Sequence, residues 1–305
     1  MKDLQLVTFG NVTIDDVVMY DGTTRMGCLG GDVIYASAAG RLFIDDVRMV
    51  APVGNDYPAE NMKLLHELGM KTDGLTVRDI PTHRNWVIYE KDGRRFWVNR
   101  TDEKNFYKLS PLYKDIPENL SHADANLILA MDLLAQEDLI NGLRGAGRFI
   151  ILDQQEDYIK GNEERLMRMI GMVDIFMPSE IEVFRILGHR DFDRAARQFH
   201  EAGCPRVVIK LGSDGCRIYD SESGISESIP CCRTNAADTT GAGDSFCGGF
   251  SAQYLATRDM KKAAIAGTIA ASFAVEDFGS QRIMRTTREQ AVQRMKTFIE
   301  ENGLG

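Results

Sequence analysis

The chain has 305 residues, of which 27% are charged and 44% hydrophobic, and its net charge is −9. This composition is ordinary for a globular protein, and the acidic balance argues against a general nucleic-acid-binding protein, which would normally carry a basic patch. No apolar run reaches the ~18 residues that a membrane span needs, and the first residues lead into a strand-like run rather than a signal peptide. The six cysteines lack zinc-ligand spacing and indicate reduced thiols, so we expect a cytoplasmic protein. The charge and the short apolar runs lead us to expect no nucleic-acid and no membrane partner.

The first hundred residues predict alternating strands and helices, interrupted by two hairpins. The apolar pattern predicts strands over 4–9, 47–53 and 74–77, with helices over 32–43 and 58–68. Such alternation implies βαβ units and a mostly parallel sheet. Strands over 17–20 and 25–29 flank Asp21-Gly22, and aromatic-rich strands over 83–90 and 94–100 flank Lys91-Asp92-Gly93, which are hairpin signals. We expect these hairpins to form a small separate sheet, with an edge extension of the main sheet as the alternative.

Alternation resumes in the second half of the chain. The pattern predicts strands over 125–129, 149–153, 173–177 and 206–210, and helices over 137–145, 162–170, 180–187 and 193–202. Antiparallel strands over 216–219 and 225–229 precede three helices over 242–256, 260–275 and 288–301. Thr286 followed by Glu289 predicts a capping box for the last helix, and Gly303 suits its end. No repeat or linker separates domains.

Residues 238–250 carry the strongest chemical signal. Gly241, Ala242 and Gly243 precede a helical run, and Asp244 lies at the junction. A helix N-terminus has unpaired N–H groups and partial positive charge, and residues this small let a phosphate approach them. An acid repels phosphate, but it can remove the proton of an attacking hydroxyl. The segment therefore predicts phosphoryl transfer from a nucleotide to an alcohol; tight packing of a small-residue helix would leave Asp244 unexplained.

The same segment, Asp-Thr-x-Gly-Ala-Gly-Asp followed by three residues and Gly-Gly-Phe, resembles the signature of the ribokinase-like (PfkB) carbohydrate kinase family. The resemblance covers essentially the whole chain. It implies a three-layer α/β/α sandwich with a mostly parallel central sheet and a small β lid from about 15–29 and 83–100, within one kinase domain over 1–305. It also implies ATP and Mg²⁺, a sugar acceptor, Asp244 as general base and the 241–244 backbone as anion hole.

The resemblance implies several residues on the acceptor side. Asp15 matches the family's aspartate that accepts hydrogen bonds from substrate hydroxyls, although Asp16 is adjacent and a local turn bond is the alternative. Gly30 and Gly31 resemble the motif where backbone approaches the sugar. Tyr35 stands where many sugar kinases have an asparagine, so it either shapes the acceptor site or packs in the core.

Arginines interleave with aromatic residues in the expected lid. The arginines are Arg84, Arg95 and Arg100, and the aromatic residues are Trp86, Phe96 and Trp97. This mixture could bind an acidic or phosphorylated sugar. We assign Arg100 to substrate binding, while an exposed hairpin made hydrophilic by arginine is the alternative. A lid sheet can also pair with the lid of a second copy, and such pairing would make a homodimer.

On the nucleotide side, Ser179 and Glu182 resemble the family's Asn-x-x-Glu motif, with serine in place of asparagine. Glu182 would bind magnesium through water. The alternative is that Glu180 and Glu182 are two exposed acids that the helix dipole favours in a first turn. Lys210, Gly212 and Gly215 resemble the turn that meets ATP.

The signature and the segment 264–279 complete the expected site. The resemblance assigns Thr239 to nucleotide binding. It also assigns the small residues of 264–279 to the wall beside the adenine, with close packing between helices as the alternative. It places Asp238 and Thr240, together with the 275–279 loop, at a metal site that could take K⁺. Two other functions stay open: a nucleoside kinase, since Gly10-Asn11 with an aspartate four residues later also resembles adenosine kinases, and a ligand-binding relative without catalysis.

Overall fold

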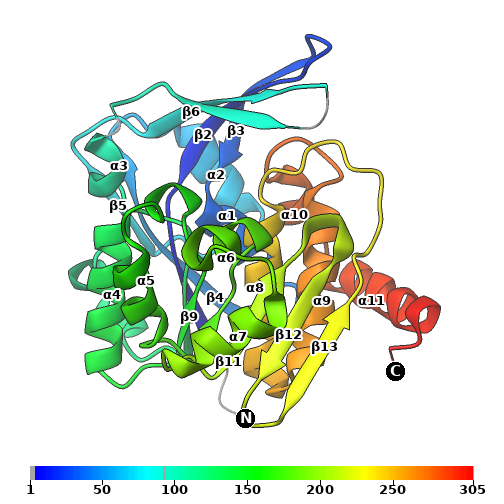
Figure 1. The fold of residues 1–305 in the computed structure, drawn as a ribbon. Helices are drawn as coiled ribbons and strands as arrows, with labels where there is room; N and C mark the ends of the chain where they lie inside the picture. Colours follow the sequence, from blue (N-terminus) through cyan, green and yellow to red (C-terminus); the bar gives the residue numbers. More distant parts are fainter. Residues whose placement is uncertain (1–3, 92–93, 103, 305) are drawn as a thin grey trace.

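Two β-sheets of different size organise the chain, which the computed structural model describes over residues 4–91, 94–102 and 104–304. Within these residues the larger sheet has nine strands in the order β13-β12-β11-β10-β9-β8-β1-β4-β5 (Figure 1). Its strands are β1 (Gln5–Phe9), β4 (Asp46–Gly54), β5 (Gly74–Arg78), β8 (Ala125–Ile128), β9 (Ile150–Leu152), β10 (Ile175–Phe176), β11 (Arg206–Lys210), β12 (Cys216–Asp220) and β13 (Ile225–Ile229). In this order, the seven strands from β11 across to β5 are all parallel to one another. β12 and β13 continue the sheet beyond β11 as antiparallel strands.

Helices cover both faces of this sheet, so its inner strands are apolar on both sides. In β8, for example, Leu127 packs into one core and Ile128 into the other. The first core is covered by α1 (Asp32–Gly40), α2 (Ala59–Glu67), α8 (Ala242–Thr257), α9 (Met260–Ala274), α10 (Gln281–Arg285) and α11 (Arg288–Asn302). The second is covered by α4 (Leu133–Gly145), α5 (Glu163–Ile170), α6 (Glu180–Leu187) and α7 (Phe192–Glu201). The chain is therefore a three-layer α/β/α sandwich.

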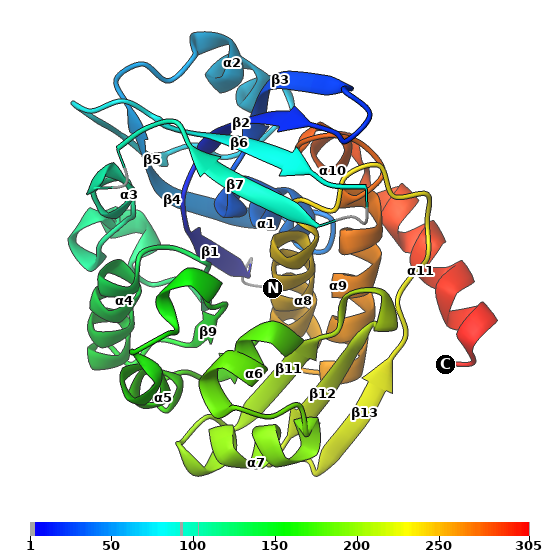
Figure 2. The ribbon, with the colours of Figure 1, turned by 45° about the horizontal axis from the view of Figure 1, so that its top comes forward.

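The smaller sheet lies over one end of the sandwich, at the top of Figure 1 and turned toward the viewer in Figure 2. Its order is β3-β2-β6-β7, from β2 (Thr13–Val18), β3 (Thr24–Gly30), β6 (His83–Tyr89) and β7 (Arg95–Asn99). β2 pairs with β6 in parallel, and β3 and β7 flank them antiparallel. This separate sheet is the expected lid and not an extension of the main sheet, although the predicted turn at 92–93 lies outside the described residues.

Several predicted elements have other bounds in the structure. The strand predicted over 17–20 is observed as β2 over Thr13–Val18, so that prediction was displaced toward the turn at Asp21-Gly22. Helix ends differ as well. The capping box of α11 is made by Thr287 and Gln290, so the predicted pair of Thr286 and Glu289 is wrong by one residue. Thr286 instead donates its hydroxyl hydrogen to the carbonyl oxygen of Arg282 in α10, a short helix that the pattern did not predict. Gly303 ends α11 with a φ of 61°, as predicted.

The sandwich brings strand ends together beneath the lid. The carboxyl ends of parallel strands share one edge of a sheet, where ligands collect in open α/β folds. β1, β9 and β11 end there at Phe9, Leu152 and Lys210. Among the described residues, no helix is both long enough and apolar enough to cross a bilayer.

Candidate active site

Helix α8 begins directly after Gly241, whose φ of 76° lies in the left-handed region. A Cβ atom on Gly241 would lie 2.3 Å from the ring of Tyr35, so both the backbone conformation and the available space require glycine. No described side chain caps this helix end, and Asp244 lies in its first turn. The N–H groups and dipole of α8 therefore favour an anion here, with a carboxylate beside it.

The ammonium group of Lys210 lies close to this helix end. Its Nζ atom is 2.5 Å from Oδ1 of Asp153, 3.6 Å from Sγ of Cys247, and 3.7 Å from the position that a Cβ atom on Gly243 would take. Burial alone would lower the pKa of Lys210, but the negative charge of Asp153 outweighs it and raises that pKa. Lys210 therefore stays protonated beside the glycine segment.

Ser179 and Glu182 form a capping box at the start of α6. The Ser179 N–H donates to Oε2 of Glu182 at 2.6 Å, and the Glu182 N–H donates to Oγ of Ser179 at 3.2 Å. Burial raises the pKa of Glu182 to about 7, whereas the charge of Lys210 lowers it. Glu182 is thus a buried neighbour of the Lys210–Asp153 pair rather than an exposed first-turn acid.

The turn that is predicted to meet ATP follows β11. Gly212 opens the short 3-10 helix η4 (Gly212–Asp214) with a φ of 57°, and Gly215 closes it with a φ of 88°. A Cβ atom on Gly215 would lie 2.0 Å from the carbonyl oxygen of Ile229, so a larger residue does not fit. This turn lies directly after Lys210 in the chain.

Asp15 lies on β2 and is 4% exposed. Its Oδ1 accepts a hydrogen bond from Nδ2 of Asn85 at 3.0 Å, and its Oδ2 accepts one from Oγ1 of Thr13 at 3.1 Å. A Cβ atom on Gly30 would lie 2.0 Å from Oδ2, so backbone approaches the carboxylate closely. Burial raises the pKa of Asp15 to about 6.

Arg100 and Asp16 belong to the opposite face of the lid. Asp16 follows Asp15 on β2, so its side chain points to the other side of the sheet. It forms an ion pair with Arg100, whose guanidinium lies 5.3 Å from the ring of Trp86. The structure therefore separates Arg100 from Asp15.

Tyr35 is buried in α1 with its ring against Gly241. Burial, followed by the charges of Asp238 and Asp15, raises its pKa well above the ordinary value. Tyr35 therefore packs in the core and also borders the acidic end of the site. Gly31, just before α1, has a φ of 102°, and a Cβ atom there would lie 2.2 Å from the carbonyl oxygen of Asn11.

Tyr89 connects the lid with the residues before α8. Its hydroxyl donates to Oδ1 of Asp238 and lies 3.1 Å from Oγ1 of Thr240. The Thr240 N–H donates to the same Oδ1 at 2.8 Å, while the buried Oδ2 of Asp238 has no described partner. Thr239 between them is exposed. The carbonyl oxygen of Val275 accepts the Ala237 N–H at 2.8 Å, which joins the predicted cation loop to the signature.

Sequence reasoning missed Asp32, Asp153 and Tyr89. Oδ1 of Asp32 accepts the N–H groups of Asn11 and Val33, both at 2.6 Å, and its buried Oδ2 has no described partner. Burial and the charge of Asp244 raise the pKa of Asp32. Asp32 comes shortly after β3, and Asp153 directly after β9. Their position at the end of a strand is the one feature of the sequence that could have indicated them.

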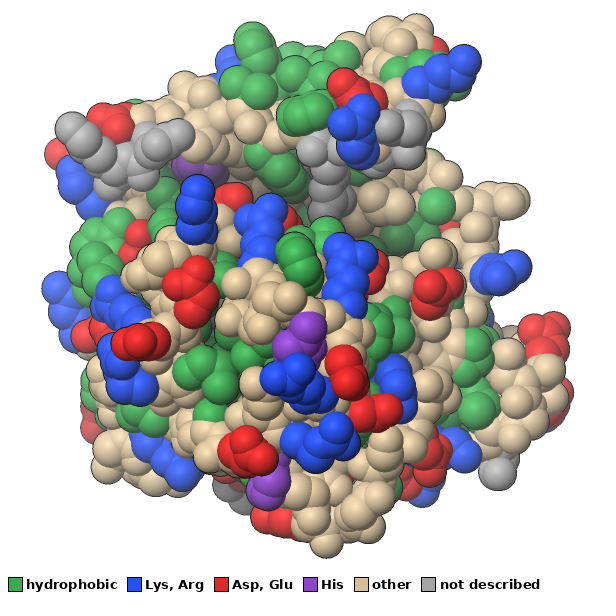
Figure 3. Space-filling view, viewed as in Figure 1, with side chains coloured by type: hydrophobic (Ala, Val, Ile, Leu, Met, Phe, Trp, Pro, Cys, Tyr) green, Lys and Arg blue, Asp and Glu red, His purple; other side chains and the backbone are tan. Residues whose placement is uncertain are grey.

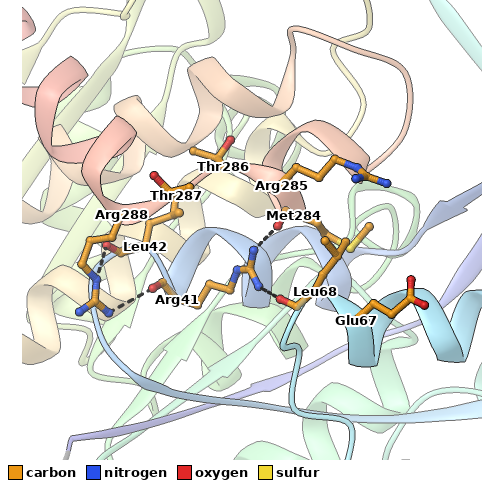
Figure 4. A pocket seen from close by; sticks show the side chains of 9 residues that line it. All are labelled: Arg41, Leu42, Glu67, Leu68, Met284, Arg285, Thr286, Thr287 and Arg288. Carbon is orange, nitrogen blue, oxygen red and sulfur yellow. Dashed lines mark hydrogen bonds between the residues drawn. The ribbon is translucent and has the colours of Figure 1, made fainter.

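Two surface cavities, of about 600 and 690 Å³, are lined by other residues. In the first, Arg41 donates to the carbonyl oxygens of Leu68 and Met284, and Arg288 donates to those of Leu42 and Arg41 (Figure 4). These arginines bind carbonyl groups at the ends of neighbouring helices, so we give this cavity a structural role.

The lid, the three layers and the helix end with its adjoining acid define a kinase of the ribokinase type. The chain belongs to the pfkB family of carbohydrate kinases, whose sequence pattern matches residues 4–287. The expected family and fold are thereby confirmed.

Individual relatives agree with this assignment. A nucleoside kinase of Methanothermobacter thermautotrophicus is 35% identical over 96% of this chain and 96% of its own length. A cytidine kinase of Thermococcus kodakarensis is 28% identical over 85% of this chain and 91% of its own length. An Escherichia coli protein provisionally assigned as ribokinase II, solved with ATP and Mg²⁺, has a TM-score of 0.79 at 21% identity, covering 98% of this chain and 99% of its own.

Proposed function

We propose that the chain, as one kinase domain over residues 1–305, transfers the γ-phosphoryl group of ATP to a hydroxyl of a sugar or sugar derivative. The observation that carries this proposal is the meeting of the uncapped α8 N-terminus, the Lys210 ammonium 3.7 Å from the Gly243 Cβ position, and Asp244 in the first turn. A cradle for phosphate thereby adjoins a base for an alcohol. Backbone and ammonium donors of this kind stabilise a transferring phosphoryl group.

The reaction uses residues on both sides of the cradle. An acceptor hydroxyl donates to Asp15, and Asp244 takes the proton of the attacking hydroxyl as its oxygen bonds to the γ-phosphorus. The bond from that phosphorus to the bridging oxygen breaks, and ADP leaves with the electron pair. The N–H groups of Gly241, Ala242 and Gly243, with Lys210, stabilise the charge. Gly212, Gly215 and Thr239 border the nucleotide.

Magnesium fits this acidic site as the partner of ATP. Among the described residues, no three His, Cys, Asp or Glu side chains could hold a metal together. Magnesium usually needs only one or two carboxylates besides phosphates and water. Glu182 is our candidate, acting through water, and the ion would neutralise phosphate charge.

A monovalent cation, K⁺ in the first instance, would bind beside Asp238 and Thr240. The buried, unpartnered Oδ2 of Asp238 supports this assignment, because such an oxygen gains a partner when a cation binds. Rates that stay unchanged when sodium or a bulky organic cation replaces potassium would count against it.

A panel assay tests the proposal. ADP release from Mg-ATP is measured with sugars, sugar acids, sugar phosphates and nucleosides in potassium buffer. We expect turnover with one substrate class. ATP binding without turnover on any compound would instead favour a ligand-binding relative that has lost catalysis.

A nucleoside kinase is the second candidate, because two similar relatives are a nucleoside kinase and a cytidine kinase. The same panel distinguishes the two: a nucleoside preferred to its free sugar by kcat/KM would establish this candidate.

The outer face of the lid supports a homodimer. Trp86, Phe96 and Val98 share this face and are 42%, 48% and 41% exposed. Figure 3 shows hydrophobic side chains gathered over the lid. A second copy's lid would cover them. We expect light scattering to give a dimer that Trp86→Ser weakens, whereas a monomeric wild type would refute this arrangement.

A further inference from the structure

Gln136 is a fully buried glutamine on α4 that holds the ends of two strands of the main sheet. Its Nε2 atom donates to the carbonyl oxygen of Leu129 at 2.8 Å and to that of Asp153 at 2.9 Å. Leu129 and Asp153 lie one residue beyond the last register pair of β8 and β9, which is Ile128 with Leu152. A buried carbonyl oxygen past the end of a ladder needs another donor, and the two amide hydrogens of Gln136 supply it.

The first turn of α4 fixes Gln136 itself. The Gln136 N–H donates to the carbonyl oxygen of Asp132 at 2.9 Å, and the carboxylate of Asp132 caps the helix by accepting the Leu134 and Ala135 N–H groups. The side-chain Oε1 of Gln136 is buried and has no described partner. A buried acceptor without a donor destabilises the fold, so the amide is present for the two hydrogens that it donates.

Asp153 connects Gln136 with the phosphate cradle at the start of α8. Its carbonyl oxygen is held by Gln136, while its Oδ1 lies 2.5 Å from Nζ of Lys210. That Nζ atom is in turn 3.7 Å from the position that a Cβ atom on Gly243 would take. Because the two groups belong to one residue, the direction of the Asp153 carboxylate depends on where Gln136 fixes its backbone.

We propose that Gln136 is a positioning residue for ATP: by holding the backbone of Asp153, it places the Lys210 ammonium beside the phosphate cradle. This inference rests on the proposed function. A charge-assisted hydrogen bond weakens steeply when its donor moves out of line, so a displaced Lys210 would bind phosphate less tightly. A glutamine with only a structural role would change the stability of the fold and leave the Kd for ATP as it is.

Asn126 provides a matched control at the opposite end of the same two strands. It lies on β8, is 2% exposed, and its Nδ2 donates to the carbonyl oxygen of Phe149 at 3.1 Å. Phe149 directly precedes β9. Gln136 and Asn126 therefore both donate to buried strand-end carbonyl groups of the β8–β9 pair, but Asn126 does so at the edge away from Lys210.

Calorimetry with Mg-ATP compares Gln136→Met, which has a similar shape without a donor, with Asn126→Leu. Both variants should unfold at a lower temperature than the wild type, because each leaves a carbonyl oxygen without its side-chain donor. We expect the Kd for Mg-ATP to rise about 10-fold in Gln136→Met, as for one weakened charge-assisted hydrogen bond, and to stay at the wild-type value in Asn126→Leu. An unchanged Kd in Gln136→Met, or an equal rise in both variants, would overturn the proposal.

A second variant covers the case in which Gln136→Met does not fold. Gln136→Glu keeps the shape of the side chain and, when its buried carboxyl group is protonated, one donor hydrogen. It is then compared with Asn126→Leu in the same way, and a Kd for Mg-ATP equal to the wild-type value would again overturn the proposal.

A double-mutant cycle shows whether the effect reaches ATP through Lys210. The background carries Asp153→Asn and Lys210→Met together, so that no unpaired charge is left buried. Adding Gln136→Met to this background should change the Kd by less than about 2-fold, because the ammonium that Gln136 positions is already absent. A further rise of about 10-fold would show an effect independent of Lys210 and overturn the proposal.

The free protein separates this inference from the proposed function. Should the wild-type chain bind no Mg-ATP, the proposed function fails, but the NMR signal of the Lys210 ammonium, assigned by its loss in Lys210→Arg, still reports the surroundings of that group. A shift of this signal in Gln136→Met and not in Asn126→Leu would support the placement of Lys210 by Gln136. The same signal position in Gln136→Met and the wild type would overturn it.

Discussion

Gly241 and Gly243 belong to the proposed phosphate cradle but have different surroundings. Gly241 has a φ of 76° and faces the ring of Tyr35, whereas the nearest atom to a Cβ on Gly243 is Nζ of Lys210 at 3.7 Å. The first position therefore tolerates no side chain, while the second has room for a methyl group. The fold therefore requires glycine at 241, whereas at 243 the proposed phosphate binding would require it.

Alanine at these two positions should give different defects. Gly241→Ala forces a clash and a strained backbone, so we expect a loss of about 1–3 kcal/mol in the free energy of unfolding and little activity. Gly243→Ala should unfold at the wild-type temperature but raise KM for ATP, because its methyl group occupies the cradle. Thermal unfolding and steady-state kinetics on both variants check this. Equal unfolding temperatures for the two would contradict it.

The residues found from sequence alone are those with local signals. Gly241 and Asp244 belong to one continuous motif, and Ser179 and Glu182 to one helix start. Asp153 bonds to Lys210, 57 residues away, and Tyr89 bonds to Asp238, 149 residues away, so their partners exist only in the folded chain.

At the scale of elements, the lid is attached to the signature and to the loop before α10. Besides the Tyr89 contacts, Oγ of Ser280 donates to the carbonyl oxygen of Leu29 on β3 at 2.6 Å. Phe278 packs against Val17, Val87 and Tyr89 of the lid. The lid and the segment before α8 are therefore connected at one junction. A substitution on one side of this junction should alter the position of residues on the other side.

Removal of the Tyr89 hydroxyl should weaken this junction. We expect Tyr89→Phe to lower kcat/KM by about 10-fold or more, because a hydrogen bond to a carboxylate is lost next to the cradle. Tyr57→Phe is the matched control, since the buried Tyr57 hydroxyl has no described partner. Similar kcat/KM values for both variants would show that Tyr89 has no positioning role.

Most sheet strands and long helices were predictable, because their apolar patterns are strong. α6, β11 and β13 have the predicted bounds. α4 begins at Leu133 instead of 137, because Asp132 caps it with hydrogen bonds to the Leu134 and Ala135 N–H groups. Short α3 (Lys104–Lys108) and α10 escaped prediction, since neither is long enough to show a helical period.

At the scale of the whole molecule, the negative charge of Asp15 lowers the stability of the protein when no acceptor is bound. The pKa of Asp15 rises from 3.8 to about 6 on burial, with Asp16 and Asp238 adding to the rise and the Cys28 thiol and Tyr35 phenol nearby. The folded state then holds the Asp15 proton more tightly than the unfolded state. This contribution to stability is present below about pH 4 and is lost as pH rises to about 6.

Asp15→Asn should therefore stabilise the free protein while it impairs acceptor binding. Above pH 7 we expect a gain of about 1–3 kcal/mol relative to the wild type, since each tenfold difference in proton affinity is worth about 1.4 kcal/mol. The gain should diminish toward pH 4, as measured by thermal unfolding across this range. A difference that is independent of pH would contradict the raised pKa of Asp15.

The central claim is that Asp244 removes a proton from an alcohol beside the α8 phosphate cradle. The most direct test measures kcat of Asp244→Asn with the best acceptor, together with the Kd for ATP by calorimetry. We predict a fall in kcat of about 10²–10⁴ with an unchanged Kd, because general-base catalysis is lost while the cradle remains. Near-normal turnover in Asp244→Asn would contradict the account.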